Sequence, residues 1–216
     1  MGFNVNQLDQ MLNNLGQDAT WELAEVCPCK STRTGGANVT CQVCNGNGLV
    51  WNVAIQCRVA LEAMSSQREF AMLGMWEKGD IMISLPTDSA AYGAGEWDRF
   101  TLLNSTLRID QVLMKGTNDT LKYSAIVSIE SLWAIVAGMR TDFTQGIHFT
   151  LNGNVITWLG TPIPIGTQYS VLYVTHPQYF CYRDLVMDRQ HGSQNLPRKV
   201  HARLMELFRK TLAGIT

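Results

Sequence analysis

Four of the six cysteines lie within eighteen residues, as two close pairs on either side of a polar loop formed by residues 30–40. The loop is rich in Ser, Thr, Gly and Asn, so it offers too few apolar side chains to build a core of its own. Two thiolate pairs across a loop of this length can close on one tetrahedral zinc ion, with sulfur ligands at about 2.3 Å. The sequence therefore predicts a structural Zn²⁺ site whose ligands are Cys27, Cys29, Cys41 and Cys44.

The second pair belongs to a longer pattern, C-x-x-C-x-G-x-G, which runs from Cys41 to Gly48. The backbone around a bound metal turns so that amide N–H groups point at sulfur, and glycine tolerates the positive φ that this turn requires. This half of the motif resembles the zinc knuckles of J-domain co-chaperones. The first pair departs from that pattern, because only Pro28 separates Cys27 from Cys29. A C-x-C pair can ligate one metal, with a tighter geometry.

Two disulfides are the alternative to zinc. The first residues lack a basic segment followed by a long apolar one, so the sequence predicts no secretory signal and a reducing compartment. Cys57 and Cys181 stand outside the cluster, and we expect both to be buried as small apolar residues. These observations favour zinc, while the disulfide alternative stays open at this point.

Length and composition bound the class of protein. The chain has 216 residues, of which 46% are hydrophobic, enough for one large domain or two small ones. The net charge of −1 argues against a strongly electrostatic nucleic-acid binder, since such domains are usually basic. No apolar run reaches the roughly 18 residues of a membrane span, so we expect no membrane partner.

Alternating apolar residues and turn signals predict a mainly β fold with short terminal helices. The apolar residues between 6 and 15 recur at helical spacing, and so do those that follow Pro197. We expect another strand over residues 68–75 and an extended contact loop over residues 87–97. The predicted division is an N-terminal helix or arm (1–18), a zinc-binding module (19–50), a small OB-like antiparallel barrel (51–135), a small sandwich-like β unit (136–195) and an amphipathic C-terminal helix (196–216).

No pattern indicates an enzyme. The four histidines, His148, His176, His191 and His201, show no metal-binding spacing among themselves, and no nucleophile or phosphate-binding motif is present. The carboxylates are scattered without a paired arrangement. A zinc ion held by four cysteines has no open position for water, which makes the predicted site structural rather than catalytic.

Several stretches resemble the small neck proteins of contractile-tailed bacteriophages, and together they cover most of the chain. These stretches are VCPCK at 26–30 with CQVCNGNGLVW at 41–51, Gly79-Asp80 before an apolar strand, EWDRF at 96–100, GTQYSV at 166–171 with His176-Pro177 beyond it, and LPRKV at 196–200 before a helix. The resemblance implies a structural virion protein that forms a homo-oligomeric ring of six or twelve copies. Such rings act as head–tail connectors, collar components or tail terminators, and they are assembled in the host cytoplasm.

The implied partners are further copies of the chain, portal or adaptor proteins, tail-tube or terminator proteins, and packaged DNA passing through the lumen. Under this hypothesis, residues 30–40 and 87–97 contact neighbouring subunits. The alternative is a zinc knuckle joined to an OB-like module that binds single-stranded nucleic acid. In that case the bases of the nucleic acid would stack on aromatic side chains such as Trp51, Tyr92, Trp97 and Tyr123. A chaperone-like module is disfavoured, because the C-x-x-C-x-G-x-G unit occurs once rather than in repeats.

Overall fold

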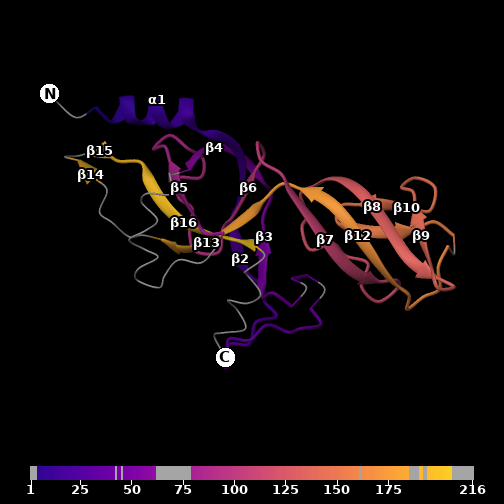
Figure 1. The fold of residues 1–216 in the computed structure, drawn as a ribbon. Coiled ribbons are helices and arrows are strands. Elements are labelled where there is room, and N and C mark those ends of the chain that lie inside the picture. Colours follow the sequence, from indigo (N-terminus) through magenta and orange to yellow (C-terminus); the bar gives the residue numbers. More distant parts are fainter. Residues whose placement is uncertain are drawn as a thin grey trace. The chain divides into compact units, whose positions relative to one another are not determined.

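A computed structural model describes residues 4–41, 43–44, 46–61, 79–160, 162–184, 190–191 and 194–205. The chain divides into two compact units (Figure 1). Unit 1 comprises Met1–Asn104 and Gln178–Thr216, and unit 2 comprises Ser105–Pro177. The predicted mainly β class is confirmed, with one short N-terminal helix, an antiparallel barrel and a four-cysteine cluster. Within the described ranges, no helix has the length and apolar character needed to cross a membrane.

Unit 1 is built on a closed six-stranded barrel in which every neighbouring pair is antiparallel. Its interior is filled by apolar side chains from all six strands, including Val59, Phe100 and Val200. Cys181 and the half-buried Cys57 also pack there, as small apolar residues do. In order around the barrel, the strands are β1 (Gln17–Glu22), β4 (Ile55–Leu61), β5 (Ile81–Leu85), β16 (Arg198–Leu204), β13 (Gln178–Asp184) and β6 (Arg99–Leu102).

Three smaller elements complete the described part of unit 1. Helix α1 (Val5–Leu15) begins at Asn4, whose side chain accepts a hydrogen bond from Asn6 N, and it ends at Gly16. Arg58 of β4 donates to the backbone oxygens of Asn13 and Gly16, so a positive charge lies at the helix C-terminus, where the helix dipole favours it. Two short two-stranded sheets pair β2 (Ala24–Val26) with β3 (Leu49–Trp51) and β14 (Gln190–His191) with β15 (Gln194–Asn195).

The segment 87–97, which we expect from the sequence to be an extended contact loop, belongs to unit 1 and is partly packed into its core. Ala91 and Ala94 are fully buried and belong to the barrel core. Tyr92 donates its hydroxyl to Leu196 O and accepts from Arg198 through its backbone oxygen. Only part of the segment therefore faces solvent, with Asp88, Ala90, Gly93 and Glu96 exposed.

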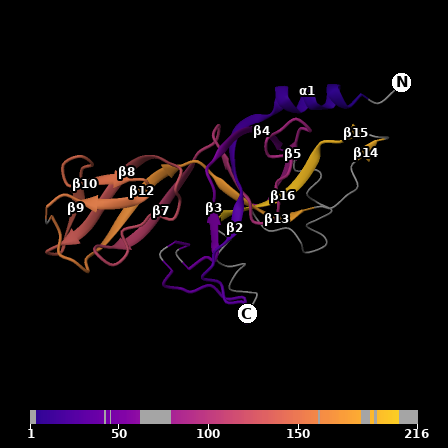
Figure 2. The same cartoon turned by 180° about the vertical axis from the view of Figure 1, so that it is seen from behind.

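Unit 2 contains a four-stranded antiparallel sheet and a hairpin (Figure 2). One face of the sheet is buried, because Leu113, Leu132, Val171 and Tyr173 alternate with more exposed residues along their strands. Trp158 of the hairpin meets Tyr169 of the sheet edge-to-face at 5.1 Å between ring centroids. The sheet order is β7 (Leu107–Met114), β12 (Gln168–Thr175), β8 (Ile126–Val136) and β9 (Met139–Phe143), and the hairpin pairs β10 (Phe149–Asn152) with β11 (Val155–Trp158).

The units differ from the division predicted from sequence. The predicted boundary at 135/136 falls inside β8, and both β7 and β8 pair with β12 rather than with barrel strands. Unit 2 is inserted between β6 and β13, which are themselves paired, so the chain leaves the barrel and returns at adjacent positions. Alternation identifies which residues of a strand are buried, but it does not name the strand that lies beside it.

The start of the predicted C-terminal helix is wrong, because Arg198–Leu204 form barrel strand β16. Val200 and Leu204 are four residues apart, a spacing that fits one face of a helix but also the two-residue period of a strand. Pairing with β5 and β13 selects the strand, and it places Val200 and Ala202 inside the barrel. The rest of that predicted helix, residues 206–216, and the predicted strand at 68–75 lie outside the described residues.

Candidate metal centre

A two-stranded ribbon positions the four-cysteine cluster. β2 and β3 pair with Val26 opposite Leu49, and the next residues continue the ladder, because Cys27 N donates to Gly48 O at 2.9 Å. The intervening loop lies at the end of this ribbon (Figure 1). The chain then turns back at once, since Lys30 N donates to Cys27 O at 3.0 Å. This turn brings the Cys29 side chain to the same end of the ribbon as Cys27.

All four predicted ligands come together. The Sγ atoms of Cys27, Cys29, Cys41 and Cys44 lie within 4.8 Å of one another. Cys27 Sγ is 3.8 Å from Cys41 Sγ, and Cys29 Sγ is 3.4 Å from Cys44 Sγ. Tetrahedral coordination with zinc–sulfur bonds of about 2.3 Å requires sulfur–sulfur separations of about 3.8 Å. The cluster can therefore hold a metal ion such as zinc.

The sulfur spacing does not match a disulfide. A disulfide bond holds its sulfurs about 2.05 Å apart, and all six cysteines of the chain are free thiols in the structure.

Cys57 lies outside the cluster. Burial raises the pKa of the Cys57 thiol to about 11, so this cysteine is protonated at neutral pH and remains part of the barrel core.

Glycines shape the backbone around Cys44 as the sequence predicted. Gly48 N lies 3.2 Å from Cys44 Sγ, the N–H to sulfur contact expected at a metal-binding thiolate. Gly46 has a φ of 78° and Gly48 a φ of 74°, both in the left-handed region that favours glycine. A Cβ added at Gly48 would lie 3.0 Å from the Ala37 Cβ, so space as well as conformation restricts this position.

The backbone also favours the thiolate form of the second cysteine pair. Hydrogen bonds from the backbone groups of Cys44 and Val43 lower the pKa of Cys41 to about 6. At Cys44 burial alone would raise the pKa, but the Gly48 N–H and the Cys29 thiol outweigh it and lower the pKa. Because the thiolate is the metal-binding form, this pair is prepared for a cation.

Cys29 differs from that pair. The backbone of Asn38 favours its thiolate, but desolvation and hydrogen bonds to the other three thiols outweigh this effect and raise its pKa to about 12. Four adjacent thiolates repel one another, so the last proton is the hardest to remove in the absence of a cation. A bound divalent ion would replace that proton and relieve the repulsion.

The ribbon is anchored to the barrel by the buried carboxylate of Asp98. Its Oδ1 accepts from Ala24 N at 2.8 Å, and its Oδ2 accepts from Trp21 Nε1 and Gly95 N, both at 2.9 Å. Asp98 is 1% exposed, and its backbone oxygen accepts from Cys181 N. One side chain thus joins the start of β2, the end of β1 and the loop before β6. No sequence pattern marks Asp98 as an anchor, because two of its three donors, Trp21 and Ala24, lie more than 70 residues away in the chain.

A second set of contacts supports β3. Trp51 Nε1 donates to Trp97 O at 3.0 Å, and the Arg99 guanidinium lies 4.6 Å from the centre of the Trp51 ring. Arg99 is held in turn by Glu22 through a half-buried ion pair of 2.6 Å. Trp97 adopts a positive φ of 73° and stacks on Phe180. Both strands of the ribbon are therefore fixed to the barrel at their base.

The aromatic residues that could stack nucleic-acid bases have other contacts. Trp51 lies beneath Arg99, Trp97 stacks on Phe180, and Tyr92 bonds to the backbone of Leu196. The fourth, Tyr123, is fully buried in unit 2. Of these four residues, Tyr123 is inaccessible to a base, whereas Trp51, Tyr92 and Trp97 are half-buried and keep part of their surface exposed.

A buried charged cluster inside unit 1 was not predicted from sequence. Both oxygens of Asp80 are engaged, by Arg203 at 3.0 Å and by His201 Nε2 at 2.9 Å. All three side chains are at most 6% exposed, and the Arg203 guanidinium lies over the Tyr182 ring at 3.9 Å. The cluster links β16 to the residue before β5, which is a structural role.

Comparisons with known proteins assign no family. No protein-family model matches the sequence, and a search of curated proteins finds no significantly similar sequence.

We expect Gly48→Ala to weaken zinc binding. The substitution strains a left-handed residue and crowds Ala37, at a cost of about 1–2 kcal/mol. Because the Gly48 N–H also contacts Cys44 Sγ, the strain acts directly on the site. Competition titration with a chromophoric chelator should show about a tenfold loss of zinc affinity. Gly93→Ala is the matched control, since nothing lies within 4 Å of its added Cβ. Equal affinities for the two variants would contradict this role of Gly48.

We expect Asp98→Ala to destabilise unit 1 by roughly 3 kcal/mol, because three buried donors lose their acceptor. Urea unfolding followed by tryptophan fluorescence measures the change. Asp88→Ala is the control, since this exposed carboxylate accepts from Asn13 Nδ2 at 3.4 Å, near the limit of a hydrogen bond. A loss at Asp98 no larger than that at Asp88 would show that the carboxylate is not an anchor.

Proposed function

We propose that the chain is a structural protein of a tailed bacteriophage, and that its four-cysteine cluster holds a structural zinc ion. In this proposal, copies of the chain form a ring in the neck of the virion, between the portal and the tail tube. The ring contains six or twelve copies and surrounds the channel through which DNA passes. The zinc-bound loop gives each subunit a rigid contact element.

The four-thiol cluster on an anchored ribbon is the observation that carries this proposal. From residue 28 to 43, no described residue is buried, so the loop has no apolar core. Its hydrogen bonds are local turns, such as Ser31 N to Gly36 O and Gly35 N to Ser31 O. Metal binding would supply the folding free energy that burial does not. A protein that needs the loop only as a connection has no reason to stiffen it with four ligands.

The surface of the loop supports a role in contacts. Val39 and Val43 are 83% and 71% exposed, and Val26 at its base is 64% exposed. Three exposed valines on so short a segment favour apolar contacts with neighbouring copies or with portal and tail proteins. Lys30 and Arg33 are exposed, and residues 27–48 contain no acidic side chain. A zinc ion bound by four thiolates carries a net charge of −2, which Lys30 and Arg33 offset, so the loop is close to neutral. Non-specific contact with the phosphates of packaged DNA would therefore come from the exposed side chains of Lys30 and Arg33 themselves.

Negative-stain electron microscopy and native mass spectrometry of the purified protein test the proposal. We expect rings of six or twelve copies that carry one zinc ion per chain. Val39→Asp should weaken the rings while zinc stays bound, because the substitution places a charge in the contact without touching a ligand. Val53→Asp serves as a control, since Val53 is 87% exposed but lies outside the loop. A protein that remains monomeric at every concentration would contradict the ring. If that monomer carried one zinc ion per chain, the proposal of a metal site would still hold.

A further inference from the structure

Strand β9 forms an open edge of the sheet in unit 2. The sheet order is β7-β12-β8-β9, so β9 pairs with β8 on one side, and no described strand pairs with its other side (Figure 2). The other edge strand, β7, is flanked by residues 120–122, which bond to the Gln111 side chain. β9 is therefore the less protected of the two edges. An exposed edge strand presents backbone groups that can pair with another chain.

The hairpin geometry shows which backbone groups of β9 face outward. β8 and β9 are joined by the two-residue turn Ala137-Gly138, in which both residues have positive φ, as in a type I′ turn. In such a hairpin the flanking pair, Val136 and Met139, exchanges backbone hydrogen bonds, and bonded pairs then alternate along the ladder. The N–H and C=O groups of Arg140 and Asp142 consequently point away from β8.

The side chains of the same two residues form a self-complementary charge pattern. Arg140 and Asp142 are two residues apart on one face of β9, where they form an ion pair with each other at 2.7 Å, and their side chains are 58% and 63% exposed, so each can also reach a charge on a neighbouring strand. If a second β9 runs antiparallel about a two-fold axis at Thr141, Arg140 of each copy lies opposite Asp142 of the other. Directly opposite residues of this kind have Cβ atoms about 5 Å apart, within reach of an ion pair. The same register pairs all the outward backbone groups of both residues.

We propose that β9 of one copy pairs antiparallel with β9 of a second copy, centred on Thr141. The two four-stranded sheets then become one continuous sheet. Two ion pairs and the backbone hydrogen bonds of Arg140 and Asp142 form the seam. The occupant of this edge is a second copy of the chain, because the charge pattern is complementary to itself.

An edge strand that is merely protected from pairing has a different pattern. Proteins block such edges with charges, especially lysine, so that identical copies repel one another. Opposite charges placed symmetrically about the middle residue attract instead. Apolar side chains also flank this edge, since Met139 is 71% and Ile135 63% exposed. Burial of these side chains at the seam would add to the polar contacts.

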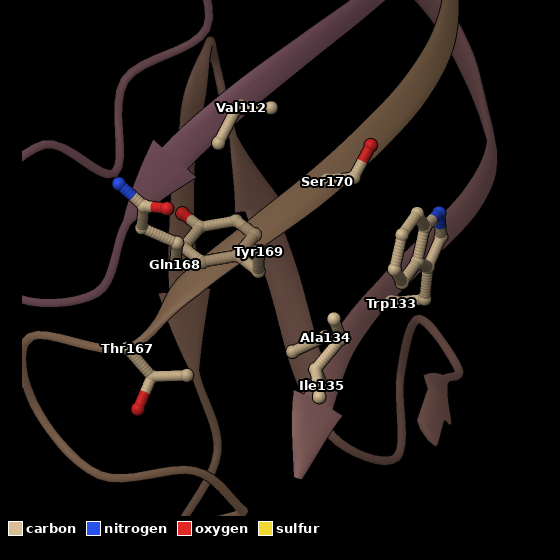
Figure 3. Close-up of a pocket in the computed structure, with 8 residues that line it drawn as sticks. All are labelled: Val112, Trp133, Ala134, Ile135, Thr167, Gln168, Tyr169 and Ser170. Carbon is tan, nitrogen blue, oxygen red and sulfur yellow. The ribbon is translucent and has the colours of Figure 1, made fainter. Parts of the chain in front are cut away.

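The open face of the sheet carries a shallow hollow, whose lining residues Figure 3 shows. Trp133 and Ile135 of β8, Val112 of β7 and Ser170 of β12 line this hollow of about 400 Å³. Arg140 lies over the Trp133 ring at 4.9 Å, so the cation of the seam rests on this surface. Pairing of two copies would place their hollows on one joined face.

This contact does not depend on the proposed ring. A two-fold contact is isologous and closes on itself, whereas a cyclic ring needs head-to-tail contacts. The β9 seam therefore makes a dimer of single chains, or it joins two rings face to face. In either case, loss of the seam halves the mass of the assembly.

Charge reversal tests the seam. In R140D, the new aspartate faces Asp142 of the second copy, and in D142R the new arginine faces Arg140. The double variant R140D/D142R restores opposite charges in every pair. We expect each single reversal to raise the Kd of the two-fold contact about tenfold or more, and the double reversal to return it to within about threefold of the original. Sedimentation equilibrium and native mass spectrometry measure the masses and Kd values.

R108D is the matched control. Arg108 also forms an exposed ion pair in the same sheet, with Glu130, but it lies on β7. We expect R108D to leave the mass unchanged. Thermal unfolding by circular dichroism shows that each variant is folded, which is expected because both β9 side chains are exposed. The proposal is overturned if the single reversals leave the mass unchanged, or if the folded double reversal fails to restore it.

Discussion

The constraint on which the rest of the structure depends is the lack of a core in the loop between the two cysteine pairs. Among the described residues of the segment 27–44, only Cys27 and Cys44 are buried. Fixing so many polar residues costs conformational entropy that local turns alone do not offset. Four sulfurs on one cation would supply the missing free energy from a single point. Three local features agree with a cation bound to the four sulfurs. They are the positive φ values at Gly46 and Gly48, the Gly48 N–H to sulfur contact and the lowered pKa of Cys41.

A stiff loop transmits force only if its base is also fixed. The Asp98 carboxylate provides this, because it collects donors from β1, from the start of β2 and from the loop before β6. Trp51, held by Trp97 and Arg99, fixes the other strand of the ribbon. The barrel below is closed, so it has no free strand edge of its own. The strand edge that we propose for self-association, that of β9, lies instead in the inserted unit 2.

Features that depend on neighbouring residues could be predicted from the sequence, whereas features that depend on pairing between distant strands could not. The clustering of the four cysteines, the two glycines and the mainly β class follow from residue types and spacing within a few positions. The insertion of unit 2 does not, because β6 and β13 pair across 75 intervening residues and no local pattern marks them as neighbours. β16 was mistaken for a helix, since the spacing of Val200 and Leu204 satisfies both periods. Asp98 was not recognised as an anchor, because a carboxylate that accepts from three distant segments has no sequence motif.

Zinc K-edge X-ray absorption of the purified protein tests the central claim most directly, because it counts and identifies the atoms bound to the metal. The account predicts one zinc ion per chain with four sulfur neighbours at about 2.3 Å and no nitrogen or oxygen ligand. A protein purified without zinc that keeps its fold and its self-association would contradict the account. So would a zinc ion with nitrogen or oxygen in its first shell.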